Sequence, residues 1–157
     1  MLDYHYGKAR KRREAILEFI PVSNIVKISD EELEFITGIS DEEKALKSLL
    51  QGDVEIIIYT KGSNGAEFIT KKGKVFSESF KVNPQDTTGA GDSFIGSFLY
   101  QVAEGNHTLE SLIDLSEETI KEFLTFSNAT AALTVCRKGA IGALPNKEEV
   151  LGLVKGR

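Results

Sequence analysis

The residues best suited to chemistry in this sequence lie between Asp86 and Phe94, which read Asp-Thr-Thr-Gly-Ala-Gly-Asp-Ser-Phe. Gly89 and Gly91 come just before an apolar stretch typical of a helix, so their N–H groups should open it without obstructing side chains. N–H groups at a helix start form a concave anion site, and a transferring phosphoryl group needs such donors. The predicted anion hole comprises Gly89, Ala90, Gly91 and Asp92.

Asp92 is the candidate catalytic base within this loop. It falls in the first turn of the predicted helix, where the helix dipole favours a negative carboxylate. An ionised carboxylate there could accept a proton from an incoming hydroxyl. In the alternative interpretation, the glycines end one element and Asp92 caps the next. Two other nucleotide motifs are excluded, because no Gly-x-x-x-x-Gly-Lys-Ser/Thr string occurs and Phe94 replaces the third glycine of a dinucleotide fingerprint.

The elements that must position this loop are predicted from hydrophobic periodicity. Residues 54–60 form the strongest strand signal, and their β-branched run indicates burial on both faces, as in a parallel sheet. A shorter strand is expected at 24–28 and a hairpin at 66–70 and 75–79. Helices are expected at about 8–19, 29–38, 40–51, 117–136 and 147–154. A further helix is expected after the glycine-rich string, with an apolar side that runs from Phe94 to Val102. This alternation predicts an α/β fold with a mostly parallel sheet flanked by helices.

Composition limits the class of protein. The chain has 157 residues, 41% of them hydrophobic, which suits a single domain spanning 1–157. A net charge of −5 argues against a general nucleic-acid partner. The basic run from Lys8 to Arg13 is interpreted as the solvated face of a helix, with an anion patch as the alternative. The single cysteine fits a reducing cytoplasm, and no apolar run approaches the roughly 18 residues of a membrane span.

The full string from Asp86 to Gly96 resembles the C-terminal signature of the ribokinase-like carbohydrate kinases, the pfkB family. The segment from Thr60 to Gly65 resembles the family's Thr-x-Gly-x-x-Gly turn, which contacts nucleotide phosphates. It follows the strongest strand, where a ligand-binding loop of an open α/β sheet is expected. An ordinary glycine turn before a hairpin is the alternative. The nucleotide-binding residues implied are Thr60, Lys61, Gly62, Ser63 and Gly65.

Ser29 to Glu32 resembles the family's Asn-x-x-Glu motif, with Ser29 in the place of asparagine. The resemblance implies that Ser29 contacts the nucleotide and that Glu32 acts on Mg²⁺, through a water where the ion keeps its hydration. A helix capping box explains the same two residues and does not exclude that role.

The segment from Asn128 to Ala132 resembles the family's adenine-side helix, with Asn128 at the purine edge. Ordinary helix packing explains its alanines equally well. Cation-activated members of the family hold a K⁺ ion behind the anion hole, largely through backbone carbonyls. The matching positions here are Asp86, Thr88, Thr134, Arg137, Gly139 and Ala143.

The resemblance implies ATP-dependent phosphorylation of a sugar hydroxyl with Mg²⁺, and K⁺ as a further cofactor. Fructose is the first choice of substrate, with ribokinase and 2-keto-3-deoxygluconate kinase activities as alternatives. Family members are about twice this length, and their first half supplies most sugar contacts and a lid, so the chain is expected to be the C-terminal half. A truncated nucleotide-binding module without turnover is therefore the competing hypothesis. Assembly with a separately supplied N-terminal half, or a homodimer of the full-length protein, are further expectations.

Overall fold

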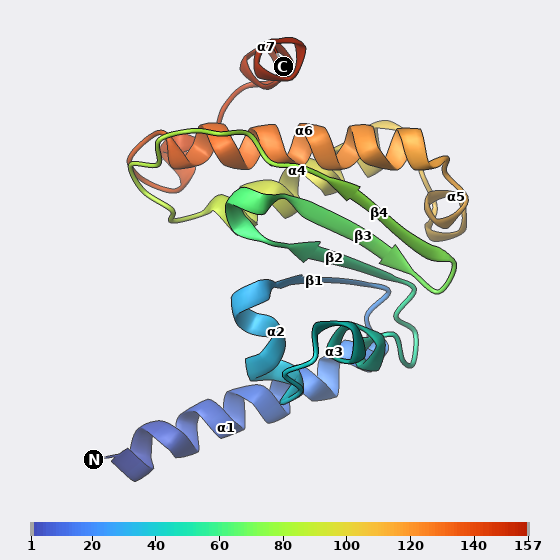
Figure 1. The fold of residues 1–157 in the computed structure, drawn as a ribbon, viewed down its shortest axis with the longest axis vertical. Coiled ribbons are helices and arrows are strands. Elements are labelled where there is room, and N and C mark those ends of the chain that lie inside the picture. The colour runs from blue at the N-terminus through green and yellow to red at the C-terminus, as the bar shows by residue number, and fades with distance from the viewer. Residues whose placement is uncertain (1, 157) are drawn as a thin grey trace.

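The computed structural model describes the backbone of residues 2–156 and the side chains from residue 11 onward. Its sheet has four strands in the order β1-β2-β3-β4. The strands are β1 (Ile25–Ser29), β2 (Ile56–Thr60), β3 (Ala66–Thr70) and β4 (Gly73–Ser77). Helices cover both faces: α1, α2 and α3 lie on one side of the sheet, and α4, α5 and α6 lie on the other (Figure 1).

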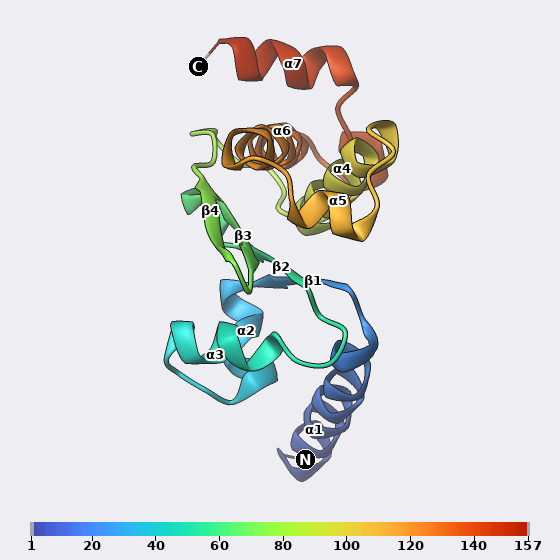
Figure 2. The same cartoon turned by 90° about the vertical axis from the view of Figure 1, so that its right-hand side faces the viewer.

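The described chain also contains α-helices on both sides of this sheet (Figure 1). They are α1 (Leu2–Phe19), α2 (Asp30–Thr37), α3 (Glu42–Leu49), α4 (Ala90–Glu104), α5 (Leu109–Ile113), α6 (Glu117–Val135) and α7 (Lys147–Lys155). Short 3-10 turns lie at Ile20–Val22, Gly62–Asn64 and Ile141–Ala143. Figure 2 shows α7 beyond α6, as the element farthest from the sheet on that side.

The expected α/β class is confirmed, but the sheet within the described residues is mixed. β1 and β2 pair in parallel because α2 and α3 form the crossover between them. β2–β3 and β3–β4 are both antiparallel, since short turns join these strands. The expectation of a mostly parallel sheet is therefore wrong for this part of the fold.

Burial of β2 on both faces divides the core into two clusters, as its sequence predicts. Ile57 and Tyr59 pack into the cluster beneath α2 and α3. Ile56 and Ile58 pack into the cluster beneath α4 and α6, which includes Phe98. Successive strand residues point to opposite faces, so an unbroken apolar run supplies both clusters.

Several element boundaries differ from the sequence expectations. α1 begins at Leu2 rather than near Lys8, and α5 was not expected. α3 begins at Glu42 rather than at Ser40, and its N-cap is Asp41, whose carboxylate accepts the Lys44 N–H at 2.9 Å. The Ser40 hydroxyl donates to Glu34 instead.

The basic run in α1 is only partly a solvated face. Lys11 and Arg12 are exposed, while Lys8 and Arg10 lie outside the described side chains. Arg13 donates from Nε to the Ile36 carbonyl at 2.8 Å and from Nη2 to the Thr37 carbonyl at 3.0 Å. A cation at these last carbonyls of α2 satisfies orphan acceptors and complements the helix dipole. Among the described residues, no helix is both long and apolar enough to cross a membrane.

Candidate functional site

The start of α4 has the geometry that the glycine-rich string predicts. Gly89 is the N-cap residue, with a left-handed φ of 81°. The intrahelical ladder begins with the Ser93 N–H, which donates to the Gly89 carbonyl at 2.8 Å. The N–H groups of Gly91 and Asp92 precede that bond, so they belong to the orphan donors of the first turn. The Ala90 N–H donates to the Thr87 carbonyl at 3.3 Å, so this donor of the predicted anion hole already has a partner.

Gly89 is required by packing as well as by its backbone angle. A Cβ atom at this position would lie 3.1 Å from the Cβ of Ala140, in the segment after α6. This distance is shorter than an ordinary van der Waals contact. The loop before α4 and the segment after α6 can therefore pack this closely only because Gly89 has no side chain.

The Asp86 carboxylate ties the same two segments together. Its Oδ1 accepts the Thr88 N–H at 3.0 Å, and its Oδ2 accepts the Gly139 N–H at 3.1 Å. The hydrogen bonds from Thr88, followed by that from Gly139, hold the pKa of Asp86 below its ordinary value. In addition, the Gln85 N–H donates to the Val135 carbonyl at 2.7 Å. The loop before α4 is thus fixed against the C-terminal end of α6.

The carboxyl ends of β1 and β2 meet at the same edge of the sheet, because Ser29 pairs with Thr60 in the parallel ladder. In Figure 1 these strand ends, the start of α4 and the end of α6 all lie at the left side of the molecule. This is the edge at which ligand sites form in open α/β sheets.

Ser29 forms a complete capping box with Glu32 at the start of α2. The Glu32 Oε2 accepts the Ser29 N–H at 2.9 Å and the Ser29 hydroxyl at 2.8 Å. Burial raises the pKa of Glu32, but the hydrogen bonds from Ser29 and the charge of Lys27 outweigh burial and hold this pKa below its ordinary value. The capping alternative is confirmed, and it leaves the carboxylate ionised at the edge of the site.

The Thr60–Gly65 segment forms a tight turn directly after β2. The Lys61 N–H donates to the Gly65 carbonyl at 2.8 Å and closes the turn. Gly62 has a φ of 51°, and a Cβ added there would meet no atom within 4 Å. Gly65, with a φ of 118°, must be a glycine because of packing: a Cβ added there would lie 2.2 Å from the Ser77 carbonyl oxygen. The Thr60 hydroxyl donates to the Ile28 carbonyl at 3.5 Å, and Ser63 is exposed at the tip of the turn.

Lys61 directs its ammonium group to a cluster of carboxylates. Its Nζ lies 2.8 Å from Glu67 Oε1 and 3.0 Å from Glu42 Oε1. Burial alone would lower the pKa of Lys61, but the bonds to Glu67 and Glu42 raise it above its ordinary value. Glu67 in β3 pairs with Tyr59 in β2, so the two side chains lie on the same face of the sheet, the face that α3 covers. The structure therefore shows Lys61 anchoring the turn through its side chain.

Asn128 is buried, with 3% of its surface exposed, between α6 and the chain that follows β4. Its Nδ2 donates to the Ser77 carbonyl at 3.0 Å and to the Glu78 carbonyl at 3.3 Å. The predicted role at a purine edge would have to use the remaining carbonyl oxygen of the Asn128 amide, since both amide protons are engaged.

The donor set for cations consists of single carboxylates and backbone carbonyls. The described residues contain no group of three or more His, Cys, Asp or Glu side chains that could hold a metal ion. Glu32 alone suits a hydrated Mg²⁺ that is held mainly by phosphates and water. Of the positions expected for K⁺, the segments around Asp86 and Gly139 are adjacent, whereas the Thr134 carbonyl already accepts the Arg137 N–H at 3.2 Å. The Arg137 side chain pairs with Glu149 on α7.

Lys27 is a residue at this edge that the sequence analysis missed. It lies in β1, yet its Nζ comes within 3.2 Å of the position that a Cβ on Gly91 would occupy. The same Nζ lies 3.6 Å from Glu32 Oε2. A lysine inside an apolar strand, Ile25-Val26-Lys27-Ile28, was the signal available in the sequence.

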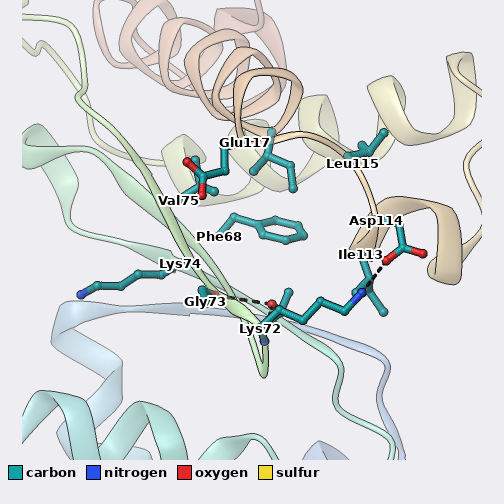
Figure 3. Close-up of a pocket in the computed structure, with 11 residues that line it drawn as sticks. Phe68, Lys72, Gly73, Lys74, Val75, Ile113, Asp114, Leu115 and Glu117 are labelled. Carbon is teal, nitrogen blue, oxygen red and sulfur yellow. Dashed lines mark hydrogen bonds and ion pairs between the residues drawn. The ribbon is translucent and has the colours of Figure 1, made fainter.

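A separate cavity of about 300 Å³ lies between the β3–β4 hairpin and the start of α6. Phe68 is one of its lining residues, and the Lys72–Asp114 ion pair joins the hairpin to the segment before α6 (Figure 3). It lies at the opposite side of the molecule from the start of α4 (Figure 1). The cavity contains none of the predicted site residues.

The described residues form an α/β fold in which backbone N–H groups without intrahelical partners open α4. Comparisons with known proteins identify the family of this fold. Residues 5–147 match the pfkB family carbohydrate kinase, and the chain belongs to this family. The chain is 40% identical over 145 residues to a probable fructokinase-2 of Arabidopsis thaliana, covering 91% of this chain and 42% of the relative.

Solved structures of fructokinases share the fold. Fructokinase with bound ATP from Xylella fastidiosa matches with a TM-score of 0.84 at 30% identity, covering 92% of this chain and 46% of that one. Fructokinase from Vibrio cholerae, in fructose, ADP and calcium ion bound form, matches with a TM-score of 0.80 at 28% identity, covering 92% and 45%. The chain thus spans less than half the length of these relatives, and the ribokinase-like fold expected from the sequence is confirmed for this portion.

Proposed function

We propose that this chain is the nucleotide-binding and catalytic half of a kinase that transfers the γ-phosphoryl group of ATP to a sugar hydroxyl, with fructose as the first candidate. The observation that carries the proposal is the first turn of α4. There, the left-handed Gly89 brings the N–H groups of Gly91 and Asp92 and the Asp92 carboxylate into one turn of backbone. The ligands of the Xylella and Vibrio fructokinases support ATP and fructose as the substrates.

In the proposed reaction the sugar hydroxyl oxygen attacks the γ-phosphorus, and the bond between this phosphorus and the bridging oxygen of ADP breaks. The Asp92 carboxylate accepts the hydroxyl proton. The N–H groups of Ala90, Gly91 and Asp92 stabilise the charge on the transferring phosphoryl oxygens. Thr60, Gly62 and Ser63 of the turn after β2, together with Ser29, would position the nucleotide phosphates.

Mg²⁺, when bound with the nucleotide, would neutralise phosphate charge during the transfer. Glu32 would orient the hydration shell of the ion, since it supplies one ionised carboxylate at the same edge of the sheet. A K⁺ ion held by carbonyls of the segments around Asp86 and Gly139 would lie behind the anion hole.

The test of the enzymatic proposal is Asp92→Asn in the full reading frame that contains this chain. Removing the base should lower kcat by about two to four orders of magnitude, while the Kd for MgATP stays nearly unchanged. A coupled assay of ADP release with fructose, ribose or 2-keto-3-deoxygluconate measures both the loss and the sugar preference. Wild-type turnover in Asp92→Asn would remove Asp92 from the mechanism.

A binding module without turnover is the second candidate function. The supporting observation is that the chain spans only 42% of its Arabidopsis relative. Calorimetric titration of the 157-residue chain with MgATP, followed by the ADP-release assay with fructose, separates the two candidates. Binding without ADP release supports the module, whereas fructose-dependent ADP release by this chain supports the enzyme.

A further inference from the structure

Ion pairs attach the first turn of α7 to α4 and to the end of α6. Lys147 Nζ lies 2.7 Å from Glu104 Oε1, at the C-terminal end of α4. Glu149 accepts hydrogen bonds from Nη1 and Nη2 of Arg137, just after α6. Val150, the next residue of α7, is buried with 2% of its surface exposed. The beginning of α7, which Figure 2 shows beyond α6, is therefore fixed to both helices.

Glu149 is held in the orientation that its pairing with Arg137 requires. Its backbone N–H donates to Asn146 Oδ1 at 2.9 Å, and its Oε2 accepts the Asn146 N–H at 2.9 Å, which completes a capping box. The hydrogen bonds from Arg137, followed by that from Asn146, hold the pKa of Glu149 below its ordinary value. Most half-exposed ion pairs contribute little, but a bidentate pair with one partner already fixed belongs to the exceptions.

Arg137 begins the loop that faces the start of α4. Two residues later the Gly139 N–H donates to Asp86 Oδ2 at 3.1 Å. Residues 138–142 are exposed, so burial of apolar surface contributes little to holding this loop. Polar contacts on its two sides hold it instead, with Asp86 on the α4 side and Glu149 on the α7 side.

We propose that Glu149 is a positioning residue for the phosphoryl-binding N–H groups at the start of α4, and that it acts through Arg137 on the loop that carries Gly139. The inference rests on the proposed function, because it adds a residue that aligns the same donors. Through these contacts α7 fixes the loop after α6, and this loop fixes the Asp86 carboxylate and the backbone around Gly89. Phosphoryl transfer depends mainly on the placement of such donors, so a small displacement of the loop is enough to slow it.

Glu149→Gln is the principal variant, because glutamine can keep the capping box while the charge paired with Arg137 is removed. It is made in the full reading frame that contains this chain. With the sugar preferred in the ADP-release assay, kcat should fall about tenfold while the KM for that sugar changes less than about twofold, because the donors act on charge that develops in the transition state. Glu148→Gln removes an exposed carboxylate from the same helical turn and is the matched control, with kcat changed less than about twofold.

Hydrogen exchange measured by mass spectrometry in the same protein separates positioning from simple docking of α7. If Glu149 only docks its own helix, Glu149→Gln speeds exchange in residues 147–155 alone. If Glu149 positions the loop, residues 86–90 also exchange about threefold faster or more, since their attachment to Gly139 is loosened.

Substitutions of Arg137 test whether the two residues act through one contact. Arg137→Met should reproduce the loss of kcat, and adding Glu149→Gln to it should lower kcat no further. Arg137→Lys retains the positive charge without the planar fork and should restore part of kcat.

The outcomes separate the inference from the proposed function. A non-additive loss of kcat in Glu149→Gln and Arg137→Met, with faster exchange in residues 86–90, supports the positioning role. Faster exchange confined to α7, or a kcat of Glu149→Gln within about twofold of wild type, overturns this role while the proposed function stands. Wild-type protein that releases no ADP with fructose, ribose or 2-keto-3-deoxygluconate overturns both.

Discussion

The Asp86 carboxylate accepts the backbone N–H of Gly139, 53 positions later in the chain, at 3.1 Å. Through this bond the loop that opens α4 is attached to the loop that follows α6. Gly89 and Ala140 meet directly beside it. The backbone at the start of α4, where the anion site is proposed, thus depends on a contact between two segments that are far apart in sequence.

Asp86→Asn should lower the Tm and make this attachment pH-insensitive. The pKa of Asp86 in the folded protein is below its ordinary value of 3.8. The contribution of the Asp86 carboxylate to folding stability is therefore fully present above pH 3.8 and is lost as the pH falls through the folded-state pKa. The difference in Tm between wild type and Asp86→Asn should therefore be full at pH 7 and shrink below about pH 4. Thermal unfolding monitored by circular dichroism from pH 7 to pH 3 measures it, and a constant difference would contradict the bridge.

Gly89→Ala should destabilise the chain by about 1–3 kcal/mol, since alanine would have to adopt a left-handed φ. The added Cβ would also press against Ala140 at 3.1 Å. Gly96→Ala is the matched control in the same helix, because no atom lies within 4 Å of its added Cβ. That control should instead stabilise the chain by about 0.5–1 kcal/mol through helix propensity. Urea unfolding of both variants gives the two signs, and equal effects would argue against a special backbone at Gly89.

Lys61→Met should destabilise the chain by about 2–3 kcal/mol, somewhat less than for a fully buried pair because 21% of the lysine side chain is exposed. The cause is Glu67, which is 7% exposed and would lose its nearest cation. The pKa of Lys61 is raised in the folded protein. The contribution of the Lys61 ammonium group to folding stability is therefore present at neutral pH and is lost only when the pH rises through this raised pKa.

A double-mutant cycle distinguishes this network from a general effect of removing a charge. Adding Glu67→Gln to Lys61→Met should recover part of the lost stability, because no unpaired carboxylate remains. Strict additivity of the two single variants in urea unfolding would show that the pair is not coupled.

Asn128→Ala should cost about 2 kcal/mol, because two carbonyl groups, those of Ser77 and Glu78, lose their shared donor. Asn128→Asp should cost more, since a carboxylate would face the same two oxygens. Urea unfolding at pH 7 measures both changes. If Asn128→Ala left stability unchanged and weakened only ATP binding, the residue would act at the purine and not as a clamp on β4.

Much of the site could be predicted because its parts are local in sequence. The glycine string before α4, the capping box of Ser29 and Glu32, and the turn after β2 each span a few residues. Their backbone preferences act over that distance, so the residue types alone indicated them. The burial of β2 on both faces could also be predicted, because an unbroken apolar run is stable only when both faces of the strand are shielded from water.

Side-chain direction and long-range pairing were decided by the tertiary structure. The sequence resemblance predicts that Lys61 belongs to a phosphate-binding turn, yet its ammonium group pairs with the carboxylates of Glu42 and Glu67. Lys27 belongs by sequence to an apolar strand, and only the folded arrangement of β1 and α4 brings its ammonium group near Gly91. The sequence by itself determined where backbone donors and an acid could gather. The tertiary structure decided which cationic side chains lie beside these groups, because charges interact according to their distance in space and not according to their separation in the sequence.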